Sequence, residues 1–278
     1  MTALSITPIR RPSWLTLPLT IGAVIILFWL VVTVLAPVLS PYDPLEMAGR
    51  RLQAPSWAHW LGTDALGRDV LSRTLYGAFH SLPIAVIVVA LSVAIGATLG
   101  AISGFIGGII GAAIMRLVDV TLSFPPMLLA MAVAASLGPG LENAAVAMVI
   151  VWWPVYARLM RAQVLEVRER EHVEAAVASG ASDSRVLTKH ILPLCWTPVL
   201  ISATMDLGQV ILLAASLSFI GLGATPPTPE WGSMISDGAA QFYSWWVALG
   251  PGLAILTIVL GFNFIGDGLH DYFDPKSK

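Results

Sequence analysis

Charge is the first property that this sequence lacks. Only 12% of its 278 residues are Asp, Glu, Lys or Arg, whereas about 25% is usual in soluble domains. Because 56% of the residues are hydrophobic, the composition predicts a protein of the lipid bilayer. The formal net charge of −2 offers no basic excess for nucleic acid. The single cysteine, Cys195, excludes an internal disulfide.

The sequence also lacks a phosphate-binding loop. The run 59–69, HWLGTDALGRD, places Gly62 and Gly67 at nearly the spacing of such a loop. A phosphate loop needs Lys and then Ser or Thr after the second glycine, to bind the terminal phosphates and magnesium. Arg68 and Asp69 occupy these positions, so a carboxylate would face the phosphates. We therefore expect no ATP site here, and the five scattered histidines show no metal-ligand spacing.

Long apolar segments are abundant, and their lengths predict an all-helical protein with six membrane-spanning helices. The first segment exceeds the roughly 7 to 15 residues of a signal-peptide core, so we interpret it as a retained span. Glycines near 107–108 predict a tight turn, and Phe-Pro-Pro at 124–126 predicts a bend in the third span. The predicted spans are about 17–39, 81–104, 112–137, 143–160, 196–222 and 246–265.

The distribution of Lys and Arg predicts the orientation, because these residues are retained in the cytoplasm during insertion. Eleven would lie on the side of the two termini and four on the opposite side. We therefore expect both termini in the cytoplasm. The eleven are Arg10, Arg11, Arg116, Arg158, Arg161, Arg168, Arg170, Arg185, Lys189, Lys276 and Lys278; the four are Arg50, Arg51, Arg68 and Arg73.

This orientation places the run 59–69 on the outer face. Glycines favour a compact turn there, in which Asp64 or Asp69 pairs with Arg68 or Arg73 in partial shelter from water. Direct contact with an external partner is the alternative. The residues of this candidate extracytoplasmic motif are Gly62, Asp64, Gly67, Arg68 and Asp69.

Side chains near the membrane boundaries allow two positional predictions. Arg116 and Asp119 stand three residues apart and are expected to pair with each other. Trp231, Trp245 and Trp246 fit an aromatic belt at the membrane–water interface.

The longest segment that cannot lie in lipid is 158–189, with six basic and five acidic residues in 32 positions. An alanine-rich helix is predicted to end at Gly180, which adopts a left-handed conformation without strain. Ser182 or Asp183 then caps a second helix that ends at Pro193. Two such helices form a rigid elbow. Its balanced charge argues against DNA binding, and a solvated connecting loop is the alternative.

Asp206 lies near the middle of the fifth predicted span. A carboxylate there costs at least about 2.5 kcal/mol on insertion scales, so it should face the bundle interior or a watery cavity. Its default interpretation is a place on a translocation pathway. The alternative is a structural hydrogen bond to a neighbouring helix, with Gln209 as the candidate intermediary. Asn263 in the sixth span is a weaker pathway candidate.

One pattern in the polar segment resembles the EAA signature of permease subunits in bacterial ABC importers: it consists of Glu174, Ala175, Ala176, Gly180, Leu192 and Pro193. The run 190–193, HILP, is similar to the form used by the dipeptide, oligopeptide and nickel branch. The C-type permease subunit of that branch is also similar in four other places, so that the resemblance covers essentially the whole chain. These are 59–69, 217–223, 227–232 and Asp274-Pro275.

The resemblance implies a type I ABC importer permease fold in the bacterial inner membrane. It implies a core permease domain at 76–278, which contains a cytoplasmic coupling loop at about 161–195. The preceding part, 1–75, would hold the N-terminal tail, the first span and the extracytoplasmic segment.

The resemblance further implies that the elbow docks on a cytoplasmic ATPase. The expected partners are a second, homologous permease, two ATPase subunits that use ATP and magnesium, and an extracytoplasmic solute-binding protein. This chain would be non-catalytic and would bind no cofactor. Short peptides are the expected cargo, and nickel or a small metal chelate is the alternative. A proton-driven secondary transporter using Asp206 is an alternative of another class, which usually shows internal repeats.

Overall fold

The computed structural model describes residues 13–273, which are mostly helical. Within this range no β-strand forms, and one isolated bridge joins Thr63 to Asp69. Several residues used above lie outside the described residues: Arg10, Arg11, Asp274, Pro275, Lys276 and Lys278. The helices are α1 Ser13–Leu39, α2 Val70–Ile106, α3 Gly108–Leu122, α4 Pro126–Leu137, α5 Leu141–Arg168, α6 Glu171–Ala178, α7 Asp183–Arg185, η1 Val186–Ile191 (a π-helix), α8 Leu192–Phe219, α9 Trp231–Ala239 and α10 Trp246–Phe273.

Five helical segments are long and apolar enough to cross a membrane, and the pair α3 and α4 makes a sixth if it is counted as one broken span. The six predicted spans are therefore confirmed in this form. Three of them are longer than predicted. The α2 helix begins at Val70, α5 continues to Arg168, and α10 continues to Phe273. A helix satisfies its own backbone polar groups, so it can continue beyond the hydrocarbon into water without a break.

The predicted turn and bend around α3 are both present. Gly107 ends α2 with a φ of 66°, a conformation that glycine adopts without steric cost. The chain then bends by 91° between α3 and α4. Two successive prolines, Pro125 and Pro126, remove the backbone donors that would continue α3, and Pro126 instead starts α4.

Small residues allow α2 and α5 to approach closely in the centre of the protein. Gly96, Gly100 and Gly104 recur every fourth residue and therefore share one face of α2. A Cβ atom at Gly100 would overlap the carbonyl of Ala157, and one at Gly104 would lie 3.0 Å from the Val164 side chain. This small-residue face brings the two backbones into contact, as is common between helices in membranes.

Trp231 fixes α9 against α1 and α2. Its indole is fully buried, its Nε1 donates to the Thr74 carbonyl at 2.9 Å, and its ring meets that of Trp29 edge to face at 5.1 Å. The expected place of Trp231 in an interfacial belt is therefore wrong, because its side chain is enclosed by other helices. A buried aromatic ring with a satisfied N–H is a strong packing anchor.

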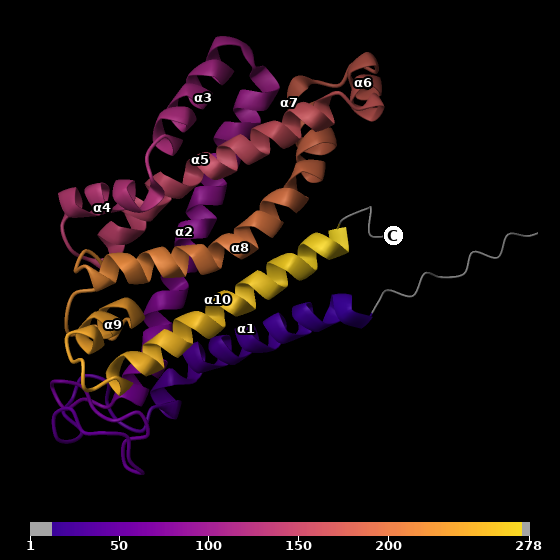
Figure 1. Ribbon diagram of the computed structural model, residues 1–278. Coiled ribbons are helices and arrows are strands. Elements are labelled where there is room, and N and C mark those ends of the chain that lie inside the picture. Colours follow the sequence, from indigo (N-terminus) through magenta and orange to yellow (C-terminus); the bar gives the residue numbers. More distant parts are fainter. Residues whose placement is uncertain (1–12, 274–278) are drawn as a thin grey trace, which may run out of the picture.

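The elements are arranged with two distinct ends (Figure 1). Residues 40–69 and α9 lie at one end, where α1 and α8 finish and α10 begins. The α6 and α7 helices lie at the other, between the end of α5 and the start of α8. The boundary predicted between 75 and 76 falls inside α2, and this division of the chain stays a prediction.

Gly100→Ala should lower the stability of the protein, because the added methyl group meets backbone that cannot move aside without separating α2 from α5. Overpacking of this kind typically costs about 1–3 kcal/mol, and thermal unfolding of the purified protein in detergent would measure it. Gly252→Ala in α10 is the matched control, since no described atom lies within 4 Å of its added Cβ. Equal thermal midpoints for the two variants would contradict the close α2–α5 contact.

Candidate functional site

The predicted elbow is present, and a specific hydrogen-bond pattern closes its first helix. The Ala181 N–H donates to the Ala176 carbonyl at 3.1 Å, and the Gly180 N–H donates to the Val177 carbonyl at 2.9 Å. With Gly180 at a φ of 79°, this is a Schellman motif. The prediction that Gly180 ends this helix in a left-handed conformation is confirmed.

The second arm of the elbow differs from the prediction. Ser182 occupies the N-cap position of α7, but its side chain makes no capping hydrogen bond. The helix also does not end at Pro193, because α7, η1 and α8 follow one another without a break. Pro193 stands in the first turn of α8, directly after the π-helical turn η1, so the helical hydrogen-bond pattern changes where its N–H is missing. The elbow (residues 171–191) is thus a direct extension of a spanning helix.

Three apolar side chains hold the elbow against the helical core. Val173 of α6 and Val186 and Ile191 of η1 are all buried in the main hydrophobic cluster. On the outward side Glu174 and Ala175 are exposed. The elbow therefore has a fixed inner face and an exposed part that carries alanines together with the carboxylates of Glu171 and Glu174. The small residues permit close approach by another protein surface.

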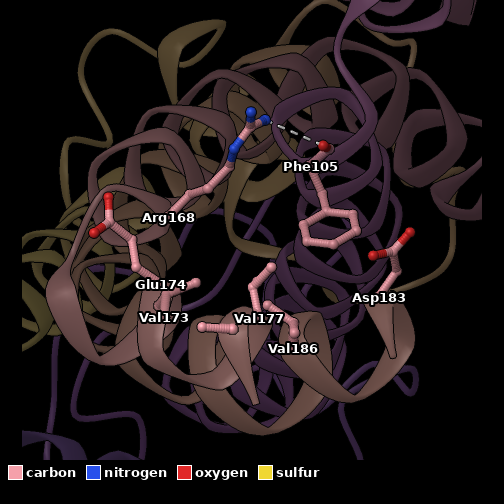
Figure 2. Close-up of a pocket in the computed structure, with 8 residues that line it drawn as sticks. Phe105, Arg168, Val173, Glu174, Val177, Asp183 and Val186 are labelled. Atoms are coloured by element: carbon pink, nitrogen blue, oxygen red, sulfur yellow. Dashed lines mark hydrogen bonds between the residues drawn. The ribbon is translucent and has the colours of Figure 1, made fainter. Parts of the chain in front are cut away.

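A cavity of about 510 Å³ lies between the elbow and the end of α2, and Figure 2 shows the side chains that line it. Arg168 closes one side by donating from Nη1 to the Phe105 carbonyl at 3.3 Å. The carboxylates of Glu174 and Asp183 stand on opposite sides, with Val177 between them. Of the predicted coupling residues, Glu174 lines this cavity, Leu192 is partly buried, and Pro193 is exposed.

At the opposite end, Asp64 organises the loop of residues 40–69, called here the outer loop. Its carboxylate accepts from Arg68 Nε at 2.7 Å and lies 3.6 Å from Arg73 Nε. All three side chains are buried. Gly62 and Gly67 have positive φ values of 69° and 80° that shape the turn around them. The predicted pairing of Asp64 with Arg68 is confirmed.

Asp69 does not pair with an arginine but caps α2. It accepts from the Ser72 N–H and from Ser72 Oγ, each at 2.8 Å, and its other oxygen lies 2.9 Å from His59 Nδ1. This cap explains why α2 begins at Val70. The sequence interpretation missed His59 as its partner. Because Asp64, Arg68 and Asp69 are enclosed, they shape the loop rather than present a contact surface.

Arg73 connects the outer loop to the segment before α9. Its Nη1 donates to the Pro44 carbonyl at 3.0 Å and approaches the Pro227 carbonyl at 3.5 Å. Next along the chain, Glu230 accepts from the Gly232 and Ser233 N–H groups at 3.0 Å each and caps α9. Burial raises the pKa of Glu230, although these two hydrogen bonds oppose the rise. Sequence reasoning had not identified this buried acid as a cap.

Within the membrane-spanning part, Asp206 forms an interhelical hydrogen bond. Tyr156 Oη of α5 donates to Asp206 Oδ2 of α8 at 2.7 Å. The predicted alternative through Gln209 names the wrong partner, since Gln209 is exposed on α8. Asn263 lies on α10, one turn from Val259 and Gly266, which contact α8.

The expected pair of Arg116 with Asp119 is also wrong: Asp119 binds Arg158 Nη2 at 2.6 Å, in an exposed salt bridge.

These observations define a multi-pass membrane protein with a polar elbow at one end. A family model described as "Binding-protein-dependent transport system inner membrane component" matches residues 96–278. The chain belongs to this family, and is therefore the membrane component of a transport system with several parts.

Three relatives are similar over most of their length. The dipeptide transport system permease protein DppC of Escherichia coli K12 is 49% identical over 267 residues, which cover 93% of this chain and 89% of that protein. DppC of Alkalihalophilus pseudofirmus is 44% identical over 260 residues, covering 93% and 86%. The glutathione transport system permease protein GsiD of Shigella flexneri serotype 5b is 45% identical over 260 residues, covering 92% and 86%.

A solved structure of the MetNI methionine ABC transporter in inward-facing conformations has the same fold. Its TM-score is 0.59 at 20% sequence identity, and the match covers 70% of this chain and 93% of that one. The expected type I importer permease fold and the resemblance to the C-type permease branch are confirmed. The orientation of the termini stays a prediction.

Asp64→Asn should destabilise the outer loop strongly, because it leaves Arg68 and Arg73 buried without their shared carboxylate. Breaking one side of a buried ion pair typically costs about 3–5 kcal/mol, which thermal unfolding in detergent would detect. Glu46→Gln is the matched control, since Glu46 is an exposed acid of the same loop. A midpoint for Asp64→Asn as high as that of the control would show that the carboxylate does not hold the loop together.

Proposed function

We propose that this chain is a permease subunit that carries short peptides across the bacterial plasma membrane, delivered by an extracytoplasmic solute-binding protein. The observation that carries this proposal is the 49% identity over 93% of the chain to a dipeptide transport permease. Relatives that transport dipeptides and glutathione share the same range. All these cargos are small peptides, which favours peptides over nickel as the cargo here.

The elbow is the proposed attachment point for a cytoplasmic ATPase. Its outer face offers Glu174, Ala175, Ala176 and Gly180, while its inner face is held in the core by Val173 and its neighbours. A partner that pushes on this face moves α5 and α8 with it, since the elbow joins them. A second, homologous permease would present an equivalent elbow to a second ATPase. ATP and magnesium are then used only by those partners.

The direction of transport follows from placing the elbow and both termini in the cytoplasm. The outer loop and α9 then face the binding protein on the opposite side. The exposed indoles of Trp57 and Trp60 on this loop are suited to such a contact, because aromatic residues are enriched at protein interfaces. Asp206, Gln209 and Asn263 are the proposed polar positions of the pathway between the two ends.

Uptake by the reconstituted complex tests the proposed function. Proteoliposomes holding this chain, its partner permease and the ATPases should accumulate a labelled dipeptide only when ATP and the loaded binding protein are both present. Uptake of nickel without uptake of any peptide would overturn the peptide assignment.

Gly180→Val should leave the chain inserted but weaken its hold on the ATPase. A β-branched residue at positive φ costs about 1–3 kcal/mol, so the Schellman motif should open and the ATPase that co-purifies should fall severalfold. Gly221→Val is the matched control, because Gly221 closes the far end of α8 with the same hydrogen bonds and a φ of 84°. The docking role is refuted if both variants retain the same amount of ATPase.

A further inference from the structure

The Tyr156–Asp206 pair joins the two helices that enter and leave the elbow. The Tyr156 side chain is fully buried, whereas Asp206 is only partly buried. The hydroxyl of Tyr156 donates to Oδ2 at 2.7 Å. A buried tyrosine of α5 thus fixes the carboxylate in place, while Asp206 as a residue stays partly exposed.

Asp206 belongs to a polar stripe on α8. Ser202 stands four residues before it and Gln209 three residues after it, so the three side chains lie on one side of the helix. Gln209 is exposed and the other two are partly exposed. Polar and ionisable residues at membrane depth face water or a polar partner rather than lipid. The stripe is therefore placed to face an aqueous path or a polar partner, and not lipid.

The carboxylate has no basic side chain of its own helix to neutralise it. The α8 helix, Leu192–Phe219, contains no Lys, Arg or His. Arg158 lies two residues beyond Tyr156 on α5, but it is engaged by Asp119. An ionised carboxylate has about four acceptor positions, more than its neighbours on α5 occupy. It is therefore suited to accept hydrogen bonds from a mobile cation.

We propose that Asp206 binds the ammonium group of the cargo as it crosses the membrane, with Tyr156 as the residue that positions the carboxylate. The ligand class is a primary ammonium on a cargo side chain, that of a lysine residue in a short peptide. This inference rests on the proposed function, because it assumes that peptides pass along α8. It adds a contribution to specificity made by the permease itself.

The location of the Tyr156–Asp206 pair connects cargo binding to the elbow and thus to the proposed ATPase. Tyr156 lies on α5, which leads into the elbow, and Asp206 lies on α8, which leads out of it. Any movement of the elbow that separates α5 from α8 also lengthens the hydrogen bond that holds the carboxylate. The site is therefore formed in one arrangement of the two helices and weakened in another, as an alternating pathway requires.

The test compares two peptides in the complete reconstituted complex. Initial uptake of Ala-Lys and of Ala-Glu is measured in proteoliposomes with saturating, peptide-loaded binding protein. The binding protein is the same for every permease variant, so its own preference cancels when variants are compared. Asp206→Asn should lower the ratio of Ala-Lys to Ala-Glu uptake by about tenfold, the order of discrimination of a hydrogen bond to a charged group.

Three further variants separate recognition from structure. Tyr156→Phe should lower the ratio in the same direction but less, since the carboxylate remains, and Asp206→Glu should keep most of the preference for Ala-Lys. Ser202→Ala changes the polarity of the same stripe without its charge and should leave the ratio unchanged. A purely structural role would reduce the uptake of both peptides equally in all the variants.

The possible results distinguish this proposal from the one on which it rests. If the unaltered complex takes up both peptides and Asp206→Asn or Tyr156→Phe has the same ratio, the ammonium site is refuted while peptide import stands. If the unaltered complex takes up no peptide, the proposed function and the ammonium site both fail. A change in ratio for Ser202→Ala as large as that for Asp206→Asn would also refute the role of the charge.

Discussion

The hydrocarbon of a bilayer offers no partner to a polar group, and this constraint accounts for most of the architecture. Backbone groups are satisfied inside helices, and charged side chains collect at the two ends of the molecule. At the outer end the charges are enclosed: Asp64 holds Arg68 and Arg73, and the buried Glu230 caps α9. At the elbow they are mostly exposed. The first end is internally neutralised, and the second leaves its charges accessible, as the proposed contact with an ATPase requires.

Close packing then joins individual helices into larger units that behave as rigid bodies. The glycine face of α2 lets α5 contact it directly, so these two helices behave as one rigid unit. The α8 helix is attached to this unit by the hydrogen bond from Tyr156 to Asp206 and by the elbow. The polar connection at mid-membrane is a single side-chain pair, whereas apolar contacts make up the rest. A contact of this kind can change without disrupting the core.

Much of the fold could be predicted from the sequence, because the thickness of the hydrocarbon layer sets the length of a spanning helix and glycine permits a tight turn. The six spans, the bend at Pro125 and the turn at Gly180 all followed from such local rules. The ion-pair and hydrogen-bond partners of individual side chains did not follow from local rules. Asp119 binds Arg158 rather than the nearby Arg116, because helices that are distant in sequence lie side by side in the fold. Tyr156 was overlooked for the same reason, since one apolar-looking residue among many carries no periodic signal.

The boundaries of the helices were the other source of error. The start of α2 at Val70 was missed although Asp69 caps it through the N–H of Ser72, a local signal; only the contact of Asp69 with His59 depends on the fold. The continuation of the helix through Pro193 was missed because the sequence pattern does not reveal the preceding π-helical turn, whose Val186 and Ile191 are buried.

The two Schellman motifs at Gly180 and Gly221 have a mechanical consequence. They bound one continuous helical lever, of which the 28 residues of α8 alone span about 42 Å at 1.5 Å per residue. A tilt of about 10° about one end of such a rod displaces the other by roughly 7 Å, by the same helix geometry. In the proposed complex the point of rotation need not lie near the elbow: a slight rotation there would suffice to widen or close a passage as wide as a small solute.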